Sequence, residues 1–549
     1  MNPANSAHTD PESCIPGDGP ADGPTGGPAN GPTDGPSDAE TDIPDPRRWW
    51  ALVTIAIAQL MVVLDATIVN IALPSAQRSL GISDGNRQWV ITAYTLAFGG
   101  LLLLGGRIAD LVGRKRTFMT GLAGFAAASA LGGAAQEPWM LFAARALQGC
   151  FGALLAPSAL SLLSITFTDV KERSKAFGIY GAIAGGGAAI GLVCGGLLTE
   201  FLTWRWCLYV NVPIALIALT GATWLLRDDR RRVRDGARLD VPGAALGCGG
   251  LVAIVYGCGA AEPRGWGDPL VLGLLGGGLL LLAVFGWWQT RAPNPLLPLH
   301  IVRDRTRAGC FLTMSLAVIA MFGMFLFMTY YLQVVLGYSP LRTGLAFLPM
   351  TAGIVLGATQ ISARLLPRVP PRTLMAPGAF LGATGLFLLT FLPTGPAYVS
   401  HVLPAELLLG LGMGLIMMPV MATATAGVAP SDSGVTSATL NTSQQVGGSI
   451  GTALLNTIAT SSSTAYITTH LKSPAGGRLT PGLRALVVRA GTVHGFTVAI
   501  AWGAGIMLLA ALVSGYLVTA GITTRPAVAA DASGHPDPYP GNSPDAPAP

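Results

Sequence analysis

Between residues 47 and 522 the chain alternates long apolar stretches with short polar connections. Most of these stretches approach the ~20 residues that an α-helix needs to cross a bilayer. We therefore predict an all-α polytopic membrane protein with fourteen transmembrane helices. The expected spans are 50–73, 88–106, 117–136, 139–167, 176–201, 206–226, 241–261, 269–289, 308–336, 342–363, 374–392, 399–428, 434–460 and 494–520. The segment 434–460, rich in Ser, Thr, Asn and Gln, has the weakest apolar signal.

The two ends of the chain have a different composition. Residues 1–46 consist largely of Pro, Gly, Asp and Ser and carry nine acidic residues but no Lys or Arg. Residues 523–549 are similar. Segments with so few apolar side chains cannot bury a core, so we predict two disordered tails. The first tail lacks the basic start and apolar centre of a signal peptide.

Composition and charge support a membrane protein and set its orientation. The chain is 51% hydrophobic and only 11% charged, whereas soluble domains carry about 25% charged residues. With the N-terminus in the cytoplasm, 23 of the 33 Lys and Arg residues fall on the cytoplasmic side, nine fall outside, and Arg145 lies within a span. Positive charge concentrates in cytoplasmic loops. We therefore predict a plasma membrane protein with both termini in the cytoplasm, and we interpret the Arg-rich segment 227–238 as a solvated loop rather than a site for nucleic acid or lipid.

Glycine and proline landmarks recur at a nearly constant offset and indicate an internal repeat, as in many transporters. Gly152 and Pro157 match Gly414 and Pro419 at an offset of 262, Gly187 and Gly191 match Gly447 and Gly451 at 260, and Asp169 matches Asp432 at 263. The predicted organisation is an N-terminal six-helix half (47–226), a basic cytoplasmic loop (227–240), an inserted helix pair (241–290) and a C-terminal six-helix half (291–522).

Ionisable residues inside the predicted spans are candidates for ion coupling. Asp65 lies midway along the first span, and Arg145 lies within the fourth. An Arg at the centre of a membrane helix costs at least ~2.5–3.5 kcal/mol, and such residues usually face the bundle interior and mark ion paths. The alternative is that Arg145 extends towards the membrane interface. Gln148 shares a helix face with Arg145. No His lies deep in a span, so we expect the proton carrier to be a carboxylate, and Asp65 is the first choice.

The segment GGRIADLVGRKR, residues 105–116, joins the second and third spans. It combines Gly106, Asp110 and Gly113 with the cations Arg114 and Lys115. Glycines permit a tight turn, and Asp110 could pair with a cation to form a latch on one conformation. The alternative, a merely basic cytoplasmic loop, explains the cations but not the spacing of the glycines and the acid.

A second group of candidates concerns helix packing and substrate. Gly187, Gly191 and Gly195 recur at steps of four and predict a close helix contact. Adaptable Met and aromatic side chains suit apolar pockets for diverse ligands, although packing or lipid contact explains them equally well. The predicted cavity residues are Gln148, Met324, Met328, Tyr331, Glu406, Asn441 and Gln445.

The chain carries no phosphate-binding loop, metal-ligand cluster or nucleophile motif, so we expect no enzyme activity, no cofactor and no metal. The seven cysteines form no CxxC pair and are expected to be buried apolar residues. We expect a monomer that binds a small molecule and protons within the lipid bilayer and does not bind nucleic acid. Energy for transport would come from an ion gradient or from the substrate itself.

Several of these segments together resemble one family. The chain resembles the fourteen-span drug:proton antiporter branch of the major facilitator superfamily through GGRIADLVGRKR (105–116), LFAARALQGCFGA (141–153), LDATIVNIALP (64–74), GGGAAIGLVCGGLL (185–198) with WRWCLYVNVP (204–213), and YLQVVLGYSPLRTGLAFLP (331–349). One departure is Leu192, where the branch commonly has Pro after the glycine.

The resemblance implies the major facilitator fold and proton-coupled efflux of small amphipathic organic molecules, such as a drug or antibiotic, by alternating access. It implies that Asp65 and Arg145 form the proton-coupling pair and that Asp110 and Arg114 form the cytoplasmic gate. The alternative function is proton-coupled uptake of a nutrient or metabolite by the same fold.

Overall fold

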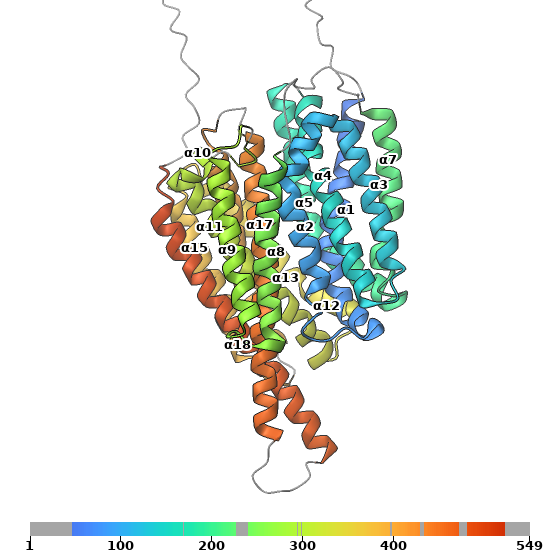
Figure 1. Ribbon diagram of the computed structural model, residues 1–549, viewed down its shortest axis with the longest axis vertical. Coiled ribbons are helices and arrows are strands. Elements are labelled where there is room, and N and C mark those ends of the chain that lie inside the picture. Colours follow the sequence, from blue (N-terminus) through green and yellow to red (C-terminus); the bar gives the residue numbers. More distant parts are fainter. Residues whose placement is uncertain are drawn as a thin grey trace, which may run out of the picture. The chain divides into compact units, whose positions relative to one another are not determined.

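The computed structural model describes residues 47–167, 169–226, 240–293, 295–297, 299–395, 398–428, 433–471 and 480–521. Within these ranges the chain is helical with short connections and contains no strand, which confirms the all-α prediction. Both predicted tails and the basic segment 227–238 lie outside the described residues. Figure 1 shows the long helices running side by side through one bundle.

The elements are α1 (Arg48–Leu80), α2 (Trp89–Val112), α3 (Arg114–Gly133), α4 (Pro138–Thr166), α5 (Val170–Phe201), α6 (Trp206–Tyr209), α7 (Asn211–Leu225), α8 (Val241–Arg264), α9 (Pro269–Gln289), α10 (Leu299–Arg303), α11 (Arg305–Tyr330), η2 (Tyr331–Val335), α12 (Pro340–Ala346), α13 (Leu348–Leu356), η3 (Gly357–Ser362), α14 (Ala363–Leu365), α15 (Arg372–Leu388), η4 (Leu389–Phe391), η5 (Tyr398–Val402), α16 (Leu403–Thr425), α17 (Ser433–Leu471) and α18 (Pro481–Leu517). We call the end of the bundle where α1 begins the basic end, and the opposite end the far end.

Eleven stretches of the described chain are long and apolar enough to cross a membrane. The three remaining predicted spans correspond to α3, α5 and α17, which are helices in the same bundle. α3 and α17 are less apolar, and the described apolar part of α5, Gly186–Phe201, is shorter than a full span. α3 opens on the sequence RKR, and α17 is rich in Ser and Thr. A polytopic all-helical protein is therefore confirmed, while the number fourteen stays a prediction.

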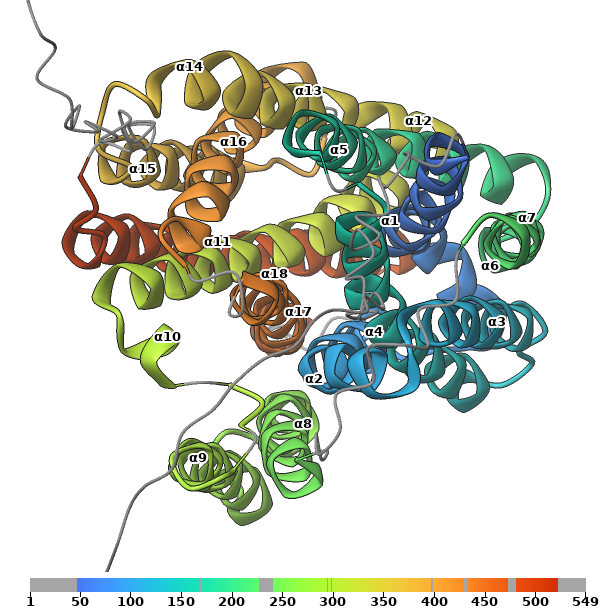
Figure 2. The same ribbon diagram turned by 90° about the horizontal axis from the view of Figure 1, so that it is seen from above.

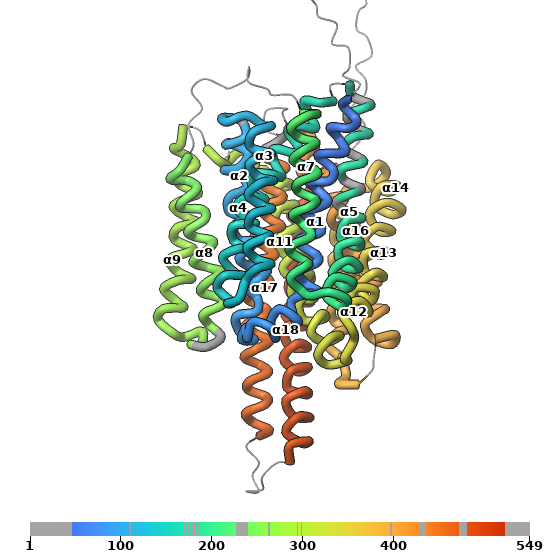
Figure 3. Tube along the Cα trace, turned by 90° about the vertical axis from the view of Figure 1, so that its right-hand side faces the viewer, coloured from blue at the N-terminus to red at the C-terminus, as the bar shows by residue number. Residues whose placement is uncertain are grey.

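The predicted spans left residues 461–493 as a connection, but most of these residues are helical in the structure. α17 continues to Leu471, and α18 already begins at Pro481. Figure 3 shows these two helices extending past the others at the far end. The reason is local: residues 452–471 contain neither Gly nor Pro. Thr480 then caps α18 by accepting a hydrogen bond from the Leu483 amide, and Pro481 occupies the first turn, where proline is tolerated.

Two helix pairs cross through the glycines of the predicted repeat. Gly191 of α5 lies against Thr67 of α1, where an added Cβ would come within 1.9 Å of the hydroxyl oxygen. Gly195 lies against the backbone of Ile68, where an added Cβ would make a tight contact of 3.0 Å. In the later part of the chain, Gly451 of α17 packs in the same way against the backbone of Ile319 on α11. Small residues that let helix backbones approach are typical of membrane bundles. The close helix contact predicted for Gly187, Gly191 and Gly195 is therefore made with α1.

The helices α8 and α9 form a pair at the edge of the bundle. They pack against each other, and α8 also contacts α2 and α17 (Figure 2). Asp240, directly before α8, is buried and accepts hydrogen bonds from the Gly243 amide at 2.9 Å, Trp288 Nε1 at 2.8 Å and Gln289 Nε2 at 2.9 Å. This carboxylate caps α8 and ties it to the end of α9.

The glycines of the α2–α3 segment give a matched prediction. A Cβ at Gly105 would lie only 2.0 Å from the Ala153 carbonyl oxygen of α4, whereas at Gly106 it would make an ordinary 3.6 Å contact with Pro157. Overpacking of this kind costs about 1–3 kcal/mol. We expect Gly105→Ala to lower the melting temperature of the purified protein and Gly106→Ala to leave it near the wild-type value. Equal melting temperatures for the two variants would contradict this account of the α2–α4 contact.

Candidate functional site

A fully buried carboxylate forms the centre of the candidate site. Asp65 of α1 is 0% exposed and has three hydrogen-bond donors around it. Its Oδ2 accepts from Arg145 Nη1 at 2.6 Å, and its Oδ1 accepts from Gln148 Nε2 at 2.9 Å and from Asn211 Nδ2 at 2.7 Å. A buried charge that is paired and hydrogen-bonded in this way is stable in an apolar interior, whereas an isolated one is not.

Arg145 of α4 is held just as fully. It is 2% exposed, its Nε donates to the Val90 carbonyl oxygen at 2.9 Å, and its Nη1 also donates to Gln148 Oε1 at 2.8 Å. Its guanidinium lies over the ring of Tyr94, 4.4 Å from the centroid, a favourable arrangement for a cation. Arg145 therefore faces the bundle interior rather than the membrane interface.

An outer layer of polar side chains orients this pair. Ser129 of α3 accepts from Gln148 Nε2 at 2.7 Å and from Asn211 Nδ2 at 3.4 Å. Five helices, α1, α2, α3, α4 and α7, thus meet at one network. The sequence reading assigned Gln148 to the substrate cavity, and the structure places it between Asp65 and Arg145. It did not single out Asn211, although a lone Asn within the apolar run 206–226 was a usable signal.

The residues of the predicted gating segment have separate positions. Gly113 has φ = +104°, a backbone conformation that glycine adopts readily. Lys115 Nζ donates to the carbonyl oxygens of Thr223 at 3.0 Å and Leu226 at 2.6 Å, so it caps the basic end of α7, where a cation is favoured. Arg114 is the first residue of α3. The side chain of Asp110 lies outside the described residues.

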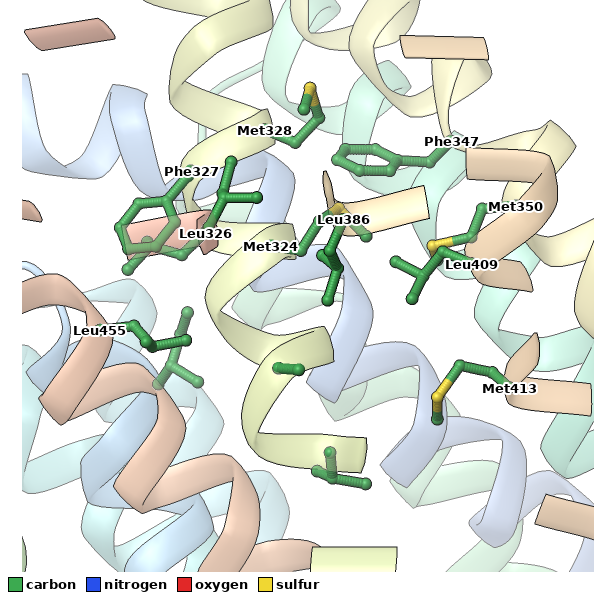
Figure 4. Packing of buried hydrophobic residues seen from close by; sticks show 14 of the residues in the cluster. Met324, Leu326, Phe327, Met328, Phe347, Met350, Leu386, Leu409, Met413 and Leu455 are labelled. Carbon is green, nitrogen blue, oxygen red and sulfur yellow. The ribbon is translucent and has the colours of Figure 1, made fainter. Parts of the chain in front are cut away.

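The Met and aromatic residues predicted to line a substrate cavity are buried in a cluster around α11. Figure 4 shows Met328 near Phe347 and Met324 near Leu386 of α15. Tyr331 is also buried, and its hydroxyl donates to the Pro393 carbonyl oxygen at 2.8 Å.

The polar cavity candidates lie in different surroundings. Asn441 donates to the Ser437 carbonyl oxygen of its own helix at 3.1 Å, and Gln445 packs against Gly99 of α2. Glu406 is 0% exposed.

A second polar group joins early and late helices at the far end. Arg87, in the α1–α2 connection, is 5% exposed, and its Nε donates to Asn456 Oδ1 of α17 at 3.1 Å. Its guanidinium lies 4.0 Å from the centroid of the Tyr330 ring of α11 and pairs with Asp84 at 3.4 Å. We call Asp84, Arg87, Tyr330 and Asn456 the far-end clamp. Sequence reasoning had counted Arg87 only as one of the outer cations.

Other hydrogen bonds between early and late helices gather near the clamp. Gln333 Nε2 donates to the Ile71 carbonyl oxygen at 2.9 Å, and the Leu341 amide donates to Glu200 Oε2 at 2.9 Å. Tyr330 donates its hydroxyl proton to Gln77. All of these residues lie in the far-end part of their helices, so several of the hydrogen bonds between early and late helices are made at that end.

Comparison with known proteins places this architecture in a family. Residues 55–452 match the sequence profile of the Major Facilitator Superfamily. The chain belongs to the Major Facilitator Superfamily. Its helices and its buried charge network are therefore those of a membrane transporter of that superfamily.

Two relatives are similar over most of their length. The puromycin resistance protein pur8 of Streptomyces alboniger is 57% identical over 477 residues, which cover 86% of this chain and 92% of that protein. The cephamycin export protein CmcT of Amycolatopsis lactamdurans is 39% identical over 424 residues, covering 76% and 87%. Both names describe resistance or export.

Solved structures of superfamily transporters share the fold. An auto-inhibited peptide transporter of the POT family superposes with a TM-score of 0.61 at 18% identity, covering 88% of this chain and 99% of that chain. A bacterial homologue of the lysosomal transporter Spinster has a TM-score of 0.58 at 17% identity, covering 85% and 96%.

Proposed function

We propose that this protein exports small amphipathic organic molecules of the drug or antibiotic kind across the cell membrane in exchange for protons. The observation that carries the proposal is the buried Asp65–Arg145 pair, which offers one protonatable group inside a superfamily transporter. The similarity to relatives named for puromycin resistance and cephamycin export supports the direction and the substrate class.

The proposed topology has fourteen spans with both termini in the cytoplasm. The basic end is then the cytoplasmic side, in agreement with the bias of Lys and Arg, and the far end faces outward. The six-helix halves 47–226 and 291–522 move against each other, and the pair 241–290 accompanies them. The recurrence of the glycine contact, α5 on α1 and α17 on α11, supports the two halves.

Coupling follows from the contacts of Arg145. A proton on Asp65 removes the negative charge that holds Arg145 Nη1, so the guanidinium is freer to shift. Arg145 Nε is bonded to the Val90 carbonyl oxygen, and the Val90 amide bonds back to the Arg87 carbonyl oxygen at 3.3 Å. The turn that leads from Arg87 into α2 therefore connects the proton site to the far-end clamp. Once the far end has opened on the substrate-loaded protein, a proton from outside reaches Asp65 and weakens the clamp, which keeps the far end open while substrate leaves outward. The empty protein then closes the far end and releases the proton inward, so the proton moves in as substrate moves out.

The test is transport in membrane vesicles of known orientation. We expect everted vesicles that express the chain to accumulate ethidium or puromycin when the interior is acid, and to lose the accumulated compound when an uncoupler collapses the gradient. Vesicles from the same host without the chain are the control. Accumulation in right-side-out vesicles, driven by an inward proton gradient, would instead establish uptake, the alternative function.

A further inference from the structure

One buried acid has no role in the coupling site. Glu406 of α16 is 0% exposed, and neither of its carboxyl oxygens has a hydrogen-bond partner among the described residues. Asp65 is equally buried but accepts three hydrogen bonds. Native proteins rarely leave a buried polar group without a partner, and such exceptions call for an explanation, which includes a functional one.

The repeat places Glu406 opposite Arg145 in the other half. The landmarks recur at offsets of 260–263, and Glu406 follows Arg145 by 261 residues. In the first half the buried Arg145 of α4 meets Asp65 of α1. On α11, which corresponds to α1, the position level with Asp65 falls close to Ala317. The second half therefore has an acid near the position of the arginine and no opposite charge to meet it.

The helices around α16 supply no cation at this depth. The elements that pack against α16 are α11, α13, η3, α15, η5 and α17. Their charged and titratable groups in the described residues are Arg305, Arg307, Cys310 and Arg372 towards the basic end, and Tyr330, Tyr398, His401, Tyr466 and His470 towards the far end. Of these groups, the Tyr398 hydroxyl already donates to the Ala346 carbonyl oxygen at 2.8 Å.

His401 is the nearest titratable group along the chain that could carry positive charge. Its Nδ1 lies 2.9 Å from Ser400 Oγ, towards the exposed side of η5. A bare carboxylate with neither donors nor a cation is far too costly in an apolar interior, and such groups take up a proton instead. Glu406 is therefore a neutral carboxylic acid in this arrangement.

The surroundings of Glu406 can adapt to a ligand. Leu409 and Met413 follow it at three and seven residues, so all three share one face of α16. Figure 4 shows Leu409 close to Met350 and both at the Met-rich cluster that contains Met324. Unbranched, flexible methionine side chains repack around ligands of different shape. An acid at the edge of such a cluster suits a molecule with an apolar body and one positive charge.

We propose that Glu406 binds the cationic nitrogen of an amphipathic substrate and gives up its proton to water when that substrate enters. The exchange replaces a neutral carboxylic acid with a carboxylate–cation pair, so the site stays neutral overall and one proton is released for each cation bound. This proposal rests on the proposed export function and adds the substrate class, organic cations, and a second proton-exchanging residue in the half that lacks the Asp65–Arg145 pair.

The test uses the purified full-length protein in lipid nanodiscs and follows fluorescence of ethidium, a permanent cation. For the wild type we expect the affinity for ethidium to rise with pH by up to tenfold per pH unit. This rise holds over the pH range in which Glu406 is protonated before ethidium binds. Glu406→Gln should bind ethidium with no such pH dependence and at least ~10-fold more weakly at pH 8 (about 1.4 kcal/mol). Glu137→Gln, a matched change at the exposed residue directly before α4, should behave as the wild type.

Two further measurements separate binding from folding. Binding of the neutral dye Nile red should be unchanged in Glu406→Gln. Glu406→Leu should melt at a higher temperature than the wild type, because replacing an unpartnered buried acid with an apolar residue of similar size removes a desolvation cost. A structural role for Glu406 would predict a lower melting temperature instead.

The outcomes distinguish this proposal from the export function. Ethidium binding that is independent of pH in the wild type, or unchanged in Glu406→Gln, overturns the assignment of Glu406 even if vesicles export neutral compounds. If wild-type vesicles export no compound in response to a proton gradient, the export function is overturned. In that case, pH-dependent ethidium binding that is lost in Glu406→Gln would still establish the Glu406 carboxyl as the binding group.

Discussion

We expect replacement of Asp65 with Asn to abolish proton-driven efflux and to leave a folded protein that still binds substrate. The amide cannot take up and release a proton, so the step that connects the gradient to movement of the two halves is missing. In vesicles, we expect accumulation of ethidium to fall to the level of the host without the chain. Exchange of labelled for unlabelled substrate, which needs no net proton movement, should persist in the variant.

The network around Asp65 explains why the fold survives. An Asn side chain can keep accepting from Gln148 and Asn211 through Oδ1, the two bonds of 2.9 and 2.7 Å. Arg145 loses its carboxylate partner but keeps the Val90 carbonyl, Gln148 and the ring of Tyr94. Breaking a buried ion pair costs about 3–5 kcal/mol, so we expect a lower melting temperature for the variant, with a monodisperse purified protein.

The matched control is Asp268→Asn. Asp268 caps α9 by accepting from the Leu270 amide at 2.8 Å, and its contact is exposed and far from the network in sequence. This change should leave efflux near the wild-type level. Proton-driven accumulation by Asp65→Asn at the wild-type level would remove Asp65 from the coupling mechanism, whereas loss of exchange as well as efflux would show that the variant had lost its substrate site.

The helical bundle could be predicted from the sequence because a lipid bilayer restricts the structures that can cross it. A span of apolar residues in lipid must satisfy its backbone hydrogen bonds internally, which leaves a helix as the only local solution. For the same reason the deep charges Asp65 and Arg145 stood out against apolar neighbours. The other polar residues of the network, Ser129 and Asn211, did not, because a small polar residue in a membrane helix can equally well bond to its own backbone, as Asn441 does.

Contacts between distant helices could not be derived from the sequence. The signal for Arg87 was a single cation in an outer connection, and only the fold brings Tyr330 and Asn456 to it. The sequence analysis missed the far-end extension of α17 and α18 because segments rich in Ser and Thr are typical of loops. In the structure these hydroxyls donate to carbonyl oxygens of their own helix, as Thr468 does to Thr464 at 2.9 Å.

The far-end clamp should control which side of the transporter is open. We expect Arg87→Ala to shift the population towards the state that is open at the far end. The substitution removes one hydrogen bond to Asn456, worth about 0.5–1.5 kcal/mol, and a cation–π contact with Tyr330, worth about 0.5–2 kcal/mol. Since about 1.4 kcal/mol changes an equilibrium tenfold, the ratio of the two states should change by roughly tenfold or more.

The shift can be measured as a distance. Spin labels on cysteines introduced at Leu131 and Val399, which are 55% and 75% exposed near the far ends of α3 and η5, report on the separation of the two halves. The native cysteines must first be replaced. The Arg87→Ala protein should show a larger fraction of long distances than the parent at neutral pH, and the parent should approach that fraction only when acidified, because a proton on Asp65 weakens the same clamp through Val90.

A neighbouring arginine provides the control. The hydrogen bonds of Arg78 run to the Pro74 carbonyl oxygen at 3.3 Å and to Ser75 Oγ at 3.5 Å, both within α1. Arg78→Ala removes the same side chain from the same end without loosening the clamp, so its distance distribution should match that of the parent. If both arginine variants opened the far end equally, net charge at that surface would explain the shift. If neither did, closure would rest on the apolar contacts between α1 and α11, and the route from Arg145 through Val90 would not carry the coupling.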